Sequence, residues 1–177
     1  MNNEKNESRA FNWMDLGDVE VGRPNLGDVT SVYAYRLMQY TMRSVLVENF
    51  GAEKADKLFY DSGKLAGKAF CENLLDKTLP FNEFIAQLQS KLLELKVGSL
   101  RVEKSDLQKM SFVFVVAEDL DCSGLPITDE TVCDYDEGFL SGLLEQYTGD
   151  RFLVKEIDCW AKGDRVCRFN INVENGK

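Results

Sequence analysis

The period of the hydrophobic pattern changes once along this chain, near residue 98, and that change limits the folds open to it. Before this point, apolar residues recur every three to four positions, which is typical of amphipathic helices. After it, they alternate or form short apolar runs, which is typical of strands. We therefore expect an α+β fold, with an antiparallel sheet of about four to five strands packed against N-terminal helices and one helix inserted before the last hairpin.

The first predicted helix, residues 30–50, carries apolar side chains around most of its circumference. Arg36, Gln39 and Arg43 form its one polar stripe. A helix of this kind is buried or lies at a subunit interface, so it predicts a homodimer. Residues 11–29, which precede it and are interrupted by glycines, predict a loop or a short edge strand.

Two more helices complete the helical part, one over residues 52–76 and one after Pro80. Gly63 and Gly67 lie four positions apart in the first of these and permit another element to pack closely. The strand-forming part is predicted as strands over 99–108 and 110–117, a helix over 135–147, and strands over 152–157 and 166–173. The second strand contains the run MSFVFVVA, which is apolar on both faces, as in a central strand covered on both sides.

Length and charge narrow the classes of partner. The 177 residues suffice for one domain, and we expect a flexible segment over 1–24 followed by a single domain over 25–177. Lys and Arg number 21 against 30 Asp and Glu, and the net charge of −9 argues against nucleic acid or an anionic membrane as a partner. No apolar run is long enough to span a membrane, and the polar N-terminus lacks the features of a secretory signal. We therefore expect a cytoplasmic protein without a membrane span.

Histidine is absent from the chain. Its absence removes Ser-His-Asp and Cys-His catalysis and His-ligated metals from consideration. No general base with a positioned partner can be identified, so the sequence predicts a binding protein and not an enzyme.

Three cysteines and a glutamate near the C-terminus form a candidate metal site. Cys159 and Cys167 lie equally far from a glycine turn, so in a hairpin they would face each other or nearly so. Cys133 precedes the last predicted helix, and Glu156 lies three residues before Cys159. Three thiolates and a carboxylate suit a closed zinc site, whereas buried free cysteines are the simpler interpretation. Glu156 can join such a site only if its strand bends at residues 157–158, because positions three apart face opposite sides of a straight strand.

Cys122 lies in an acidic loop predicted over residues 118–131. It could be a reactive thiol, a redox sensor, an additional metal ligand or an ordinary cysteine, and the sequence leaves these alternatives open.

The C-terminal stretch CDYDEGFLSGLLEQYTGDRFLVKEIDCWAKGDRVCRFNI, residues 133–171, resembles the closing half of the 4-vinyl reductase domain, also called the predicted hydrocarbon-binding domain. That pattern runs through a cysteine, a G-x-x-x-G helix, a glycine before a strand, Glu-x-x-Cys and Cys-x-Phe. Its positions are filled here by Cys133, Gly138, Gly142, Gly149, Glu156, Cys159, Gly163, Cys167 and Phe169. The preceding helices also resemble the family, so the resemblance covers residues 28–174.

This resemblance implies a fold, a metal and a ligand. Related sensor domains of phenol- and xylene-responsive activators bind a small aromatic molecule between helices and sheet, and hold a zinc through three cysteines and a glutamate. The corresponding residues here are Cys133, Glu156, Cys159 and Cys167, so the resemblance implies a structural zinc at these positions. The fold is also similar to that of transport-particle subunits that hold an acyl chain.

The chain departs from the phenol sensors at the ligand. Those sensors orient the ligand hydroxyl with a histidine and a tryptophan, whereas this chain has no histidine and carries Phe112 about where the tryptophan would be. We therefore expect an apolar, hydrocarbon-like or acyl-like ligand. The aromatic residues expected around it are Phe112, Phe114, Phe139, Tyr40, Phe59 and Phe84.

Two functions follow from these observations. The first is a dimeric small-molecule sensor with a structural zinc, whose output passes to a separate signalling protein because the ATPase and DNA-binding domains of the activators are not in this sequence. The second is a dimeric interaction or scaffold module of the transport-particle type, without a ligand.

Overall fold

The computed structural model describes residues 10–174 and contains five α-helices, two short 3-10 helices and four strands within them. In chain order these are η1 (Trp13–Leu16), α1 (Val19–Gly22), α2 (Val32–Phe50), α3 (Ala52–Leu74), α4 (Phe81–Glu94), β1 (Ser99–Asp106), β2 (Ser111–Ala117), α5 (Asp134–Thr148), β3 (Phe152–Asp158), η2 (Trp160–Lys162) and β4 (Cys167–Val173). The predicted change from helices to strands is confirmed, and most predicted boundaries agree within two residues.

The four strands form one antiparallel sheet in the order β1-β2-β4-β3. The inserted helix α5 connects β2 to β3, so the last hairpin returns with β4 next to β2. The predicted α+β architecture, with a helix inserted before the last hairpin, is confirmed. Gly163 adopts a left-handed conformation with φ of +99°, which suits the turn predicted there.

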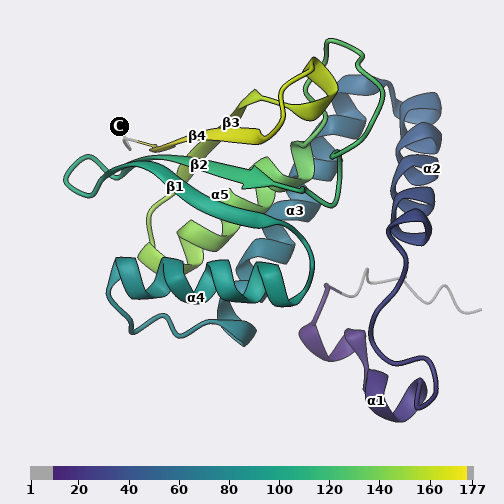
Figure 1. Cartoon of the computed structure of the whole chain (residues 1–177), viewed down its shortest axis with the longest axis horizontal. Coiled ribbons are helices and arrows are strands. Elements are labelled where there is room, and N and C mark those ends of the chain that lie inside the picture. The colour runs from purple at the N-terminus through teal and green to yellow at the C-terminus, as the bar shows by residue number, and fades with distance from the viewer. Residues whose placement is uncertain (1–9, 175–177) are drawn as a thin grey trace, which may run out of the picture.

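The helices lie in successive layers on one face of the sheet (Figure 1). Helix α4 packs on β1 and α5 packs on β3, α3 lies against α5, and α2 contacts α3 at the edge of the molecule. The core between sheet and helices is built from large side chains such as Phe84, Leu88, Phe114, Leu143 and Phe169, all fully buried. This order puts α5 in the centre and α2 on the outside.

Four glycines let α3 and α5 approach each other closely. A Cβ atom built on Gly63 or Gly67 would lie 2.0 Å from a carbonyl oxygen of α5, and one built on Gly138 or Gly142 would lie 2.0 Å from a carbonyl oxygen of α3. No side chain fits at such a distance. The predicted close packing at the Gly63 pair is thus confirmed, and the second glycine pair is its counterpart on α5.

The sheet differs from the prediction in one respect, because helices cover only one of its faces. On the other face Leu153 is 58% exposed, and Lys155 and Asn170 are exposed as well. Val115 is nevertheless fully buried there, since its cross-strand neighbours are Arg101 and Arg168. Long charged side chains cover apolar surface with their methylene groups, so the run is apolar on both sides without a second layer of helices.

The segment before α2 also differs from the prediction. It forms the short helices η1 and α1 and no edge strand in its described part, residues 10–31. Asn12 and Asp18 cap these helices through their side chains, which explains why this polar, glycine-containing stretch is helical. The rest of the predicted flexible segment, residues 1–9, lies outside the described residues. Among residues 10–174, every helix is too short or too polar to cross a membrane.

Candidate functional site

Four cysteines from four parts of the chain meet in the protein interior. The sulfur atoms of Cys122, Cys133, Cys159 and Cys167 all lie within 4.8 Å of one another, and all four side chains are buried. The Cys133 sulfur is 4.0 Å from that of Cys159 and 3.8 Å from that of Cys167. Sulfur atoms around a tetrahedral zinc with Zn–S bonds of about 2.3 Å lie about 3.8 Å apart, so this donor set fits the ion. The Cys122 and Cys167 sulfurs are closer, at 3.0 Å, and would separate slightly around a metal.

The fold explains why these positions converge. Cys133 immediately precedes α5, Cys167 is the first residue of β4, and Cys159 follows the end of β3. The β3–β4 register shifts between Glu156 and Asp158, which is a β-bulge at the bend that a shared site requires. Because of this bulge, Glu156 and Cys159 are both buried, instead of facing opposite sides of the strand.

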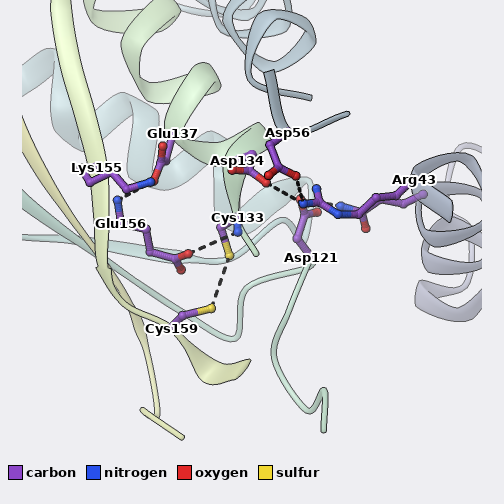
Figure 2. Close-up of polar contacts among 10 residues, drawn as sticks. Arg43, Asp56, Asp121, Cys133, Asp134, Glu137, Lys155, Glu156 and Cys159 are labelled. Atoms are coloured by element: carbon purple, nitrogen blue, oxygen red, sulfur yellow. Dashed lines mark hydrogen bonds and ion pairs between the residues drawn. The ribbon is translucent and has the colours of Figure 1, made fainter. Parts of the chain in front are cut away.

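Glu156 lies beside the sulfur cluster and supports it (Figure 2). Its Oε2 accepts a hydrogen bond of 3.2 Å from the backbone N–H of Cys133, while its Oε1 is buried without a hydrogen-bond partner. Burial raises the pKa of Glu156 to about 8. Its backbone N–H donates to Glu137 of α5, whose carboxylate also accepts from Lys155. The strand that carries Glu156 is therefore tied to the first turn of α5.

The four thiols compete for protons. Hydrogen bonds from Cys122, Cys133 and Cys167 hold the pKa of Cys159 far below its ordinary value, whereas the pKa of Cys133 is raised because it donates to its neighbours. Such a set gives up one proton readily and the others only when a cation neutralises the accumulating charge. The arrangement therefore suits a metal ion that binds thiolates.

A cavity of about 550 Å³ lies next to this cluster, between the N-terminal segment, α3, α5 and the end of α4. Its walls are mostly apolar, and include Leu65, Ala66, Phe70, Leu92, Val97 and Phe139. Trp13 and Leu16 of η1 line it from the N-terminal side. A second cavity of about 290 Å³ adjoins it, since Tyr35, Ser62 and Tyr135 line both.

One end of the large cavity is polar, because helix α2 and the acidic loop meet there. Asp121 accepts hydrogen bonds from the hydroxyl of Tyr35 at 2.7 Å and from the amide of Gln39 at 2.8 Å. Asp136, in the first turn of α5, also lines the cavity, and its Oδ2 is buried without a hydrogen-bond partner. Burial and the neighbouring carboxylates of Asp119 and Asp121 raise the pKa of Asp136 well above its ordinary value. Burial raises the pKa of Asp119 to about 7.

The structure separates the aromatic residues predicted to surround a ligand. Phe139 lines the large cavity, and Phe59 lines the adjoining one. Tyr40 donates a hydrogen bond to the backbone carbonyl of Asp121. The other three belong to the packed core and line none of the three cavities described between residues 10 and 174; they are Phe84, Phe112 and Phe114. Their rings contact other aromatic rings, as Phe112 does by stacking on Phe81 with centroids 4.9 Å apart.

Sequence reasoning left the role of Cys122 open and missed Asp121 and Asp136. The sulfur of Cys122 joins the cluster because Asp119 accepts hydrogen bonds from the backbone N–H groups of Asp121 and Cys122 and so shapes the loop. A cysteine and two acids in one loop, next to the predicted ligands, were the available signal. Asp136 could have been noticed as an acid on the side of α5 that also carries Phe139, three positions later.

Comparison with known sequences places the cluster within a described domain. The sequence model of the vinyl-4-reductase domain matches residues 112–173, which include all four clustered cysteines and Glu156. Two uncharacterized proteins of Methanocaldococcus jannaschii are similar in sequence. One is 22% identical over 161 residues, covering 91% of this chain and 88% of the relative. The other is 27% identical over 103 residues, covering 58% of this chain and 61% of the relative.

Three solved structures share the fold. The phenol-responsive sensory domain of the transcription activator PoxR, with phenol, has a TM-score of 0.64 and 18% identity, covering 82% of this chain and 76% of its own. A vinyl-4-reductase family protein from Methanocaldococcus jannaschii has a TM-score of 0.61 and 16% identity, covering 94% and 99%. A trafficking protein particle complex subunit 3 from Naegleria fowleri, covalently bound to palmitic acid, has a TM-score of 0.64 and 10% identity, covering 81% and 95%. At these identities the likeness is one of fold.

Proposed function

This chain carries a vinyl-4-reductase domain, and from that premise we propose that it is a small-molecule sensor domain with a structural zinc site. The observation that carries the proposal is the position of α5. Its beginning holds Cys133 in the sulfur cluster, and its first turns place Asp136 and Phe139 on the wall of the large cavity. A metal site and a ligand cavity thus share one helix.

We assign the zinc ligands as Cys122, Cys133, Cys159 and Cys167, with Glu156 holding the backbone of Cys133. This differs from the set implied by the resemblance, in which Glu156 is the fourth ligand. Four buried sulfurs within 4.8 Å of one another support it, because zinc bound by four protein ligands is structural. When bound, the ion would neutralise the thiolates and fix the loop, α5 and the β3–β4 hairpin to one another.

The proposed ligand site is the 550 Å³ cavity, whose volume is in the ordinary range for small-molecule sites. Its walls support a ligand with a large apolar part, as the sequence predicted. The sensor domain that binds phenol and the trafficking subunit that holds palmitic acid share this fold, which supports a cavity function without fixing the ligand.

We further propose that the protein binds its ligand without transforming it, and that a separate signalling protein receives the output. The reduced thiols of the cluster suit the cytoplasm. The alternative function, a dimeric scaffold module, is favoured by one observation. Helix α2 buries none of its residues, and Tyr33 on it is 87% exposed. A dimer through α2 is compatible with both functions.

Native mass spectrometry of the purified full chain tests metal and ligand together. We expect one zinc per chain, and its loss from Cys122→Ser and Cys159→Ser variants, while Cys71→Ser retains it because Cys71 is buried outside the cluster. Glu156→Gln should keep the zinc but bind it about 10- to 100-fold more weakly, as is usual when a supporting residue is lost.

The ligand arm of the same experiment fills the cavity. Ala66→Phe should abolish binding of toluene, used as an apolar probe, and keep the zinc, because Ala66 lines the cavity. Ala86→Phe, on the exposed side of α4, is the matched control and should bind like the wild type. Toluene binding that survives Ala66→Phe would contradict the assigned cavity, and full zinc retention by Cys122→Ser would contradict the assigned ligand set.

A further inference from the structure

The charges on the wall of the large cavity all have one sign. Asp121 and Asp136 are the charged side chains among the described residues that line it, and no lysine or arginine is present in that lining. The remaining polar lining groups are three hydroxyls, from Tyr35, Ser62 and Tyr135, and the Tyr35 hydroxyl already donates to Asp121. The cavity therefore combines an apolar body with one acidic end.

Two acceptors at this end lack donors. Within residues 10–174, the Oδ2 atom of Asp136 and the Oε1 atom of Gln39 are buried and have no hydrogen-bond partner. Asp121, in the same region, has both carboxylate oxygens occupied by Tyr35 and Gln39. Buried polar atoms in proteins almost always have partners, and leaving an acceptor unpaired is costly. These atoms therefore call for donors from outside the chain.

The nearby basic side chains are already engaged. Arg36 donates from Nε to the carbonyl of Leu120 at 2.7 Å and from Nη2 to the carbonyl of Ser123 at 2.9 Å. Arg43 forms ion pairs with Asp56 and Asp134, as Figure 2 shows. Neither guanidinium bonds to Asp136. The donor that Asp136 lacks is thus not supplied by a neighbouring cation of this chain.

We propose that the cavity takes an apolar molecule that carries a protonated amine, with the nitrogen donating to Asp136 and the hydrocarbon part against the apolar walls. This rests on the proposed function and names the chemical class of its ligand. A carboxylate head group would meet two acids of its own sign, and a plain hydrocarbon would leave Asp136 unpaired. The structure thus narrows the expectation of a ligand without polar groups to one with a single cationic end.

Isothermal titration calorimetry on the zinc-loaded full chain tests this with four probes: n-octylamine, 1-octanol, octanoate and toluene. Octylamine is protonated at neutral pH and should bind at least about tenfold more tightly than 1-octanol, because a hydrogen bond to a charged group is stronger than a neutral one. Octanoate should bind most weakly. Asp136→Asn should lower octylamine affinity about tenfold or more and leave 1-octanol affinity almost unchanged. Asp150→Asn, at an exposed acid outside the cavity, is the control and should change neither.

The possible results separate the inference from the proposed function. Equal or tighter binding of 1-octanol or octanoate by the wild type overturns the inference even if Asp136→Asn fails to fold. So does an unchanged octylamine affinity in folded Asp136→Asn. A second zinc per chain that is lost in Asp136→Asn would also overturn it, and would instead make Asp136 a metal ligand together with Asp119 and Cys133, whose ligand atoms also lie within 4.8 Å of one another. Toluene and octanol binding without an amine preference overturns the inference alone, whereas no binding of any probe overturns the proposed function as well.

Discussion

Helices α2 and α5 both carry apolar side chains around much of their circumference, yet they occupy opposite environments. Helix α5 buries seven residues and lies between the sheet and α3, whereas α2 buries none and stands at the edge of the molecule (Figure 1). The difference lies in what each helix allows a neighbour to do. Gly138 and Gly142 let the backbone of α3 approach α5, whereas α2 contains no glycine.

The inward face of α2 is its polar stripe. Arg36 and Gln39 donate hydrogen bonds to the loop that carries Asp121, and Arg43 forms ion pairs with Asp56 and Asp134. The apolar positions of α2 consequently point outward, where a second copy of the chain can cover them. The comparison teaches that apolar content alone does not put a helix in a core, because backbone approach and polar partners decide which face turns inward.

The largest expected effect is at the α3–α5 contact. Gly142→Ala places a methyl group 2.0 Å from the carbonyl oxygen of Lys64, and backbone cannot yield without separating the helices. We expect a loss of about 3 kcal/mol or more in the free energy of unfolding, measured by urea denaturation. Gly22→Ala has no atom within 4 Å of the new methyl and should change stability by less than about 0.5 kcal/mol. Similar stabilities for the two variants would mean that close approach does not explain the burial of α5.

An intermediate effect is expected at the exposed face of α2. Leu37 is 69% exposed there, and Leu37→Glu should shift the protein from a dimer to a 20.1 kDa monomer at micromolar concentration in sedimentation velocity experiments. The matched control is Leu153→Glu on the open face of the sheet, where the leucine is 58% exposed, and it should leave the dimer intact. A wild-type protein that sediments as a monomer would leave the apolar face of α2 without its proposed partner.

The smallest effect is expected at the rim of the α3–α5 contact. Glu145 forms ion pairs with Lys64 at 2.7 Å and Lys68 at 2.5 Å. Burial acts to raise the pKa of Glu145, but these lysines outweigh it and hold that pKa below its ordinary value. A lowered carboxyl pKa stabilises the folded state above the ordinary pKa, and the contribution is lost as the pH falls below it.

Glu145→Gln should therefore cost about 1 kcal/mol or less at pH 7, and the difference from the wild type should shrink as the pH falls below about 4. Thermal unfolding at several pH values measures this. Glu94→Gln, which removes the exposed pair with Lys91 on α4, should have no measurable effect at any pH. A Glu145→Gln penalty that persists at pH 3 would show that the side chain acts through packing and not through its charge.

The sequence predicted the order and type of the major elements because their hydrophobic periods are strong. It also placed Cys133, Glu156, Cys159 and Cys167 near one another, from the hairpin spacing and the family resemblance. It did not predict which aromatic residues surround the cavity, because Phe112 and Phe139 have the same character in sequence. Only the stacking of helices decides that Phe112 faces other rings while Phe139 faces open space.

The polar end of the cavity was beyond prediction for a different reason. It forms where Tyr35 and Gln39 of α2 meet Asp121, more than 80 residues later in the chain, and no local pattern encodes such a meeting. The helical form of η1 and α1 was missed because caps at Asn12 and Asp18 outweigh the glycines nearby.

The short distance along α5 from Cys133 to Asp136 and Phe139 has a thermodynamic consequence. If the metal and the cavity ligand favour the same position of this helix, each must increase the affinity of the other by the same factor, because coupling between two binding sites is reciprocal. The concentration of available zinc would then set the threshold at which the protein responds to its ligand. A domain built in this way reports on two chemical quantities at once, with one helix as the shared variable.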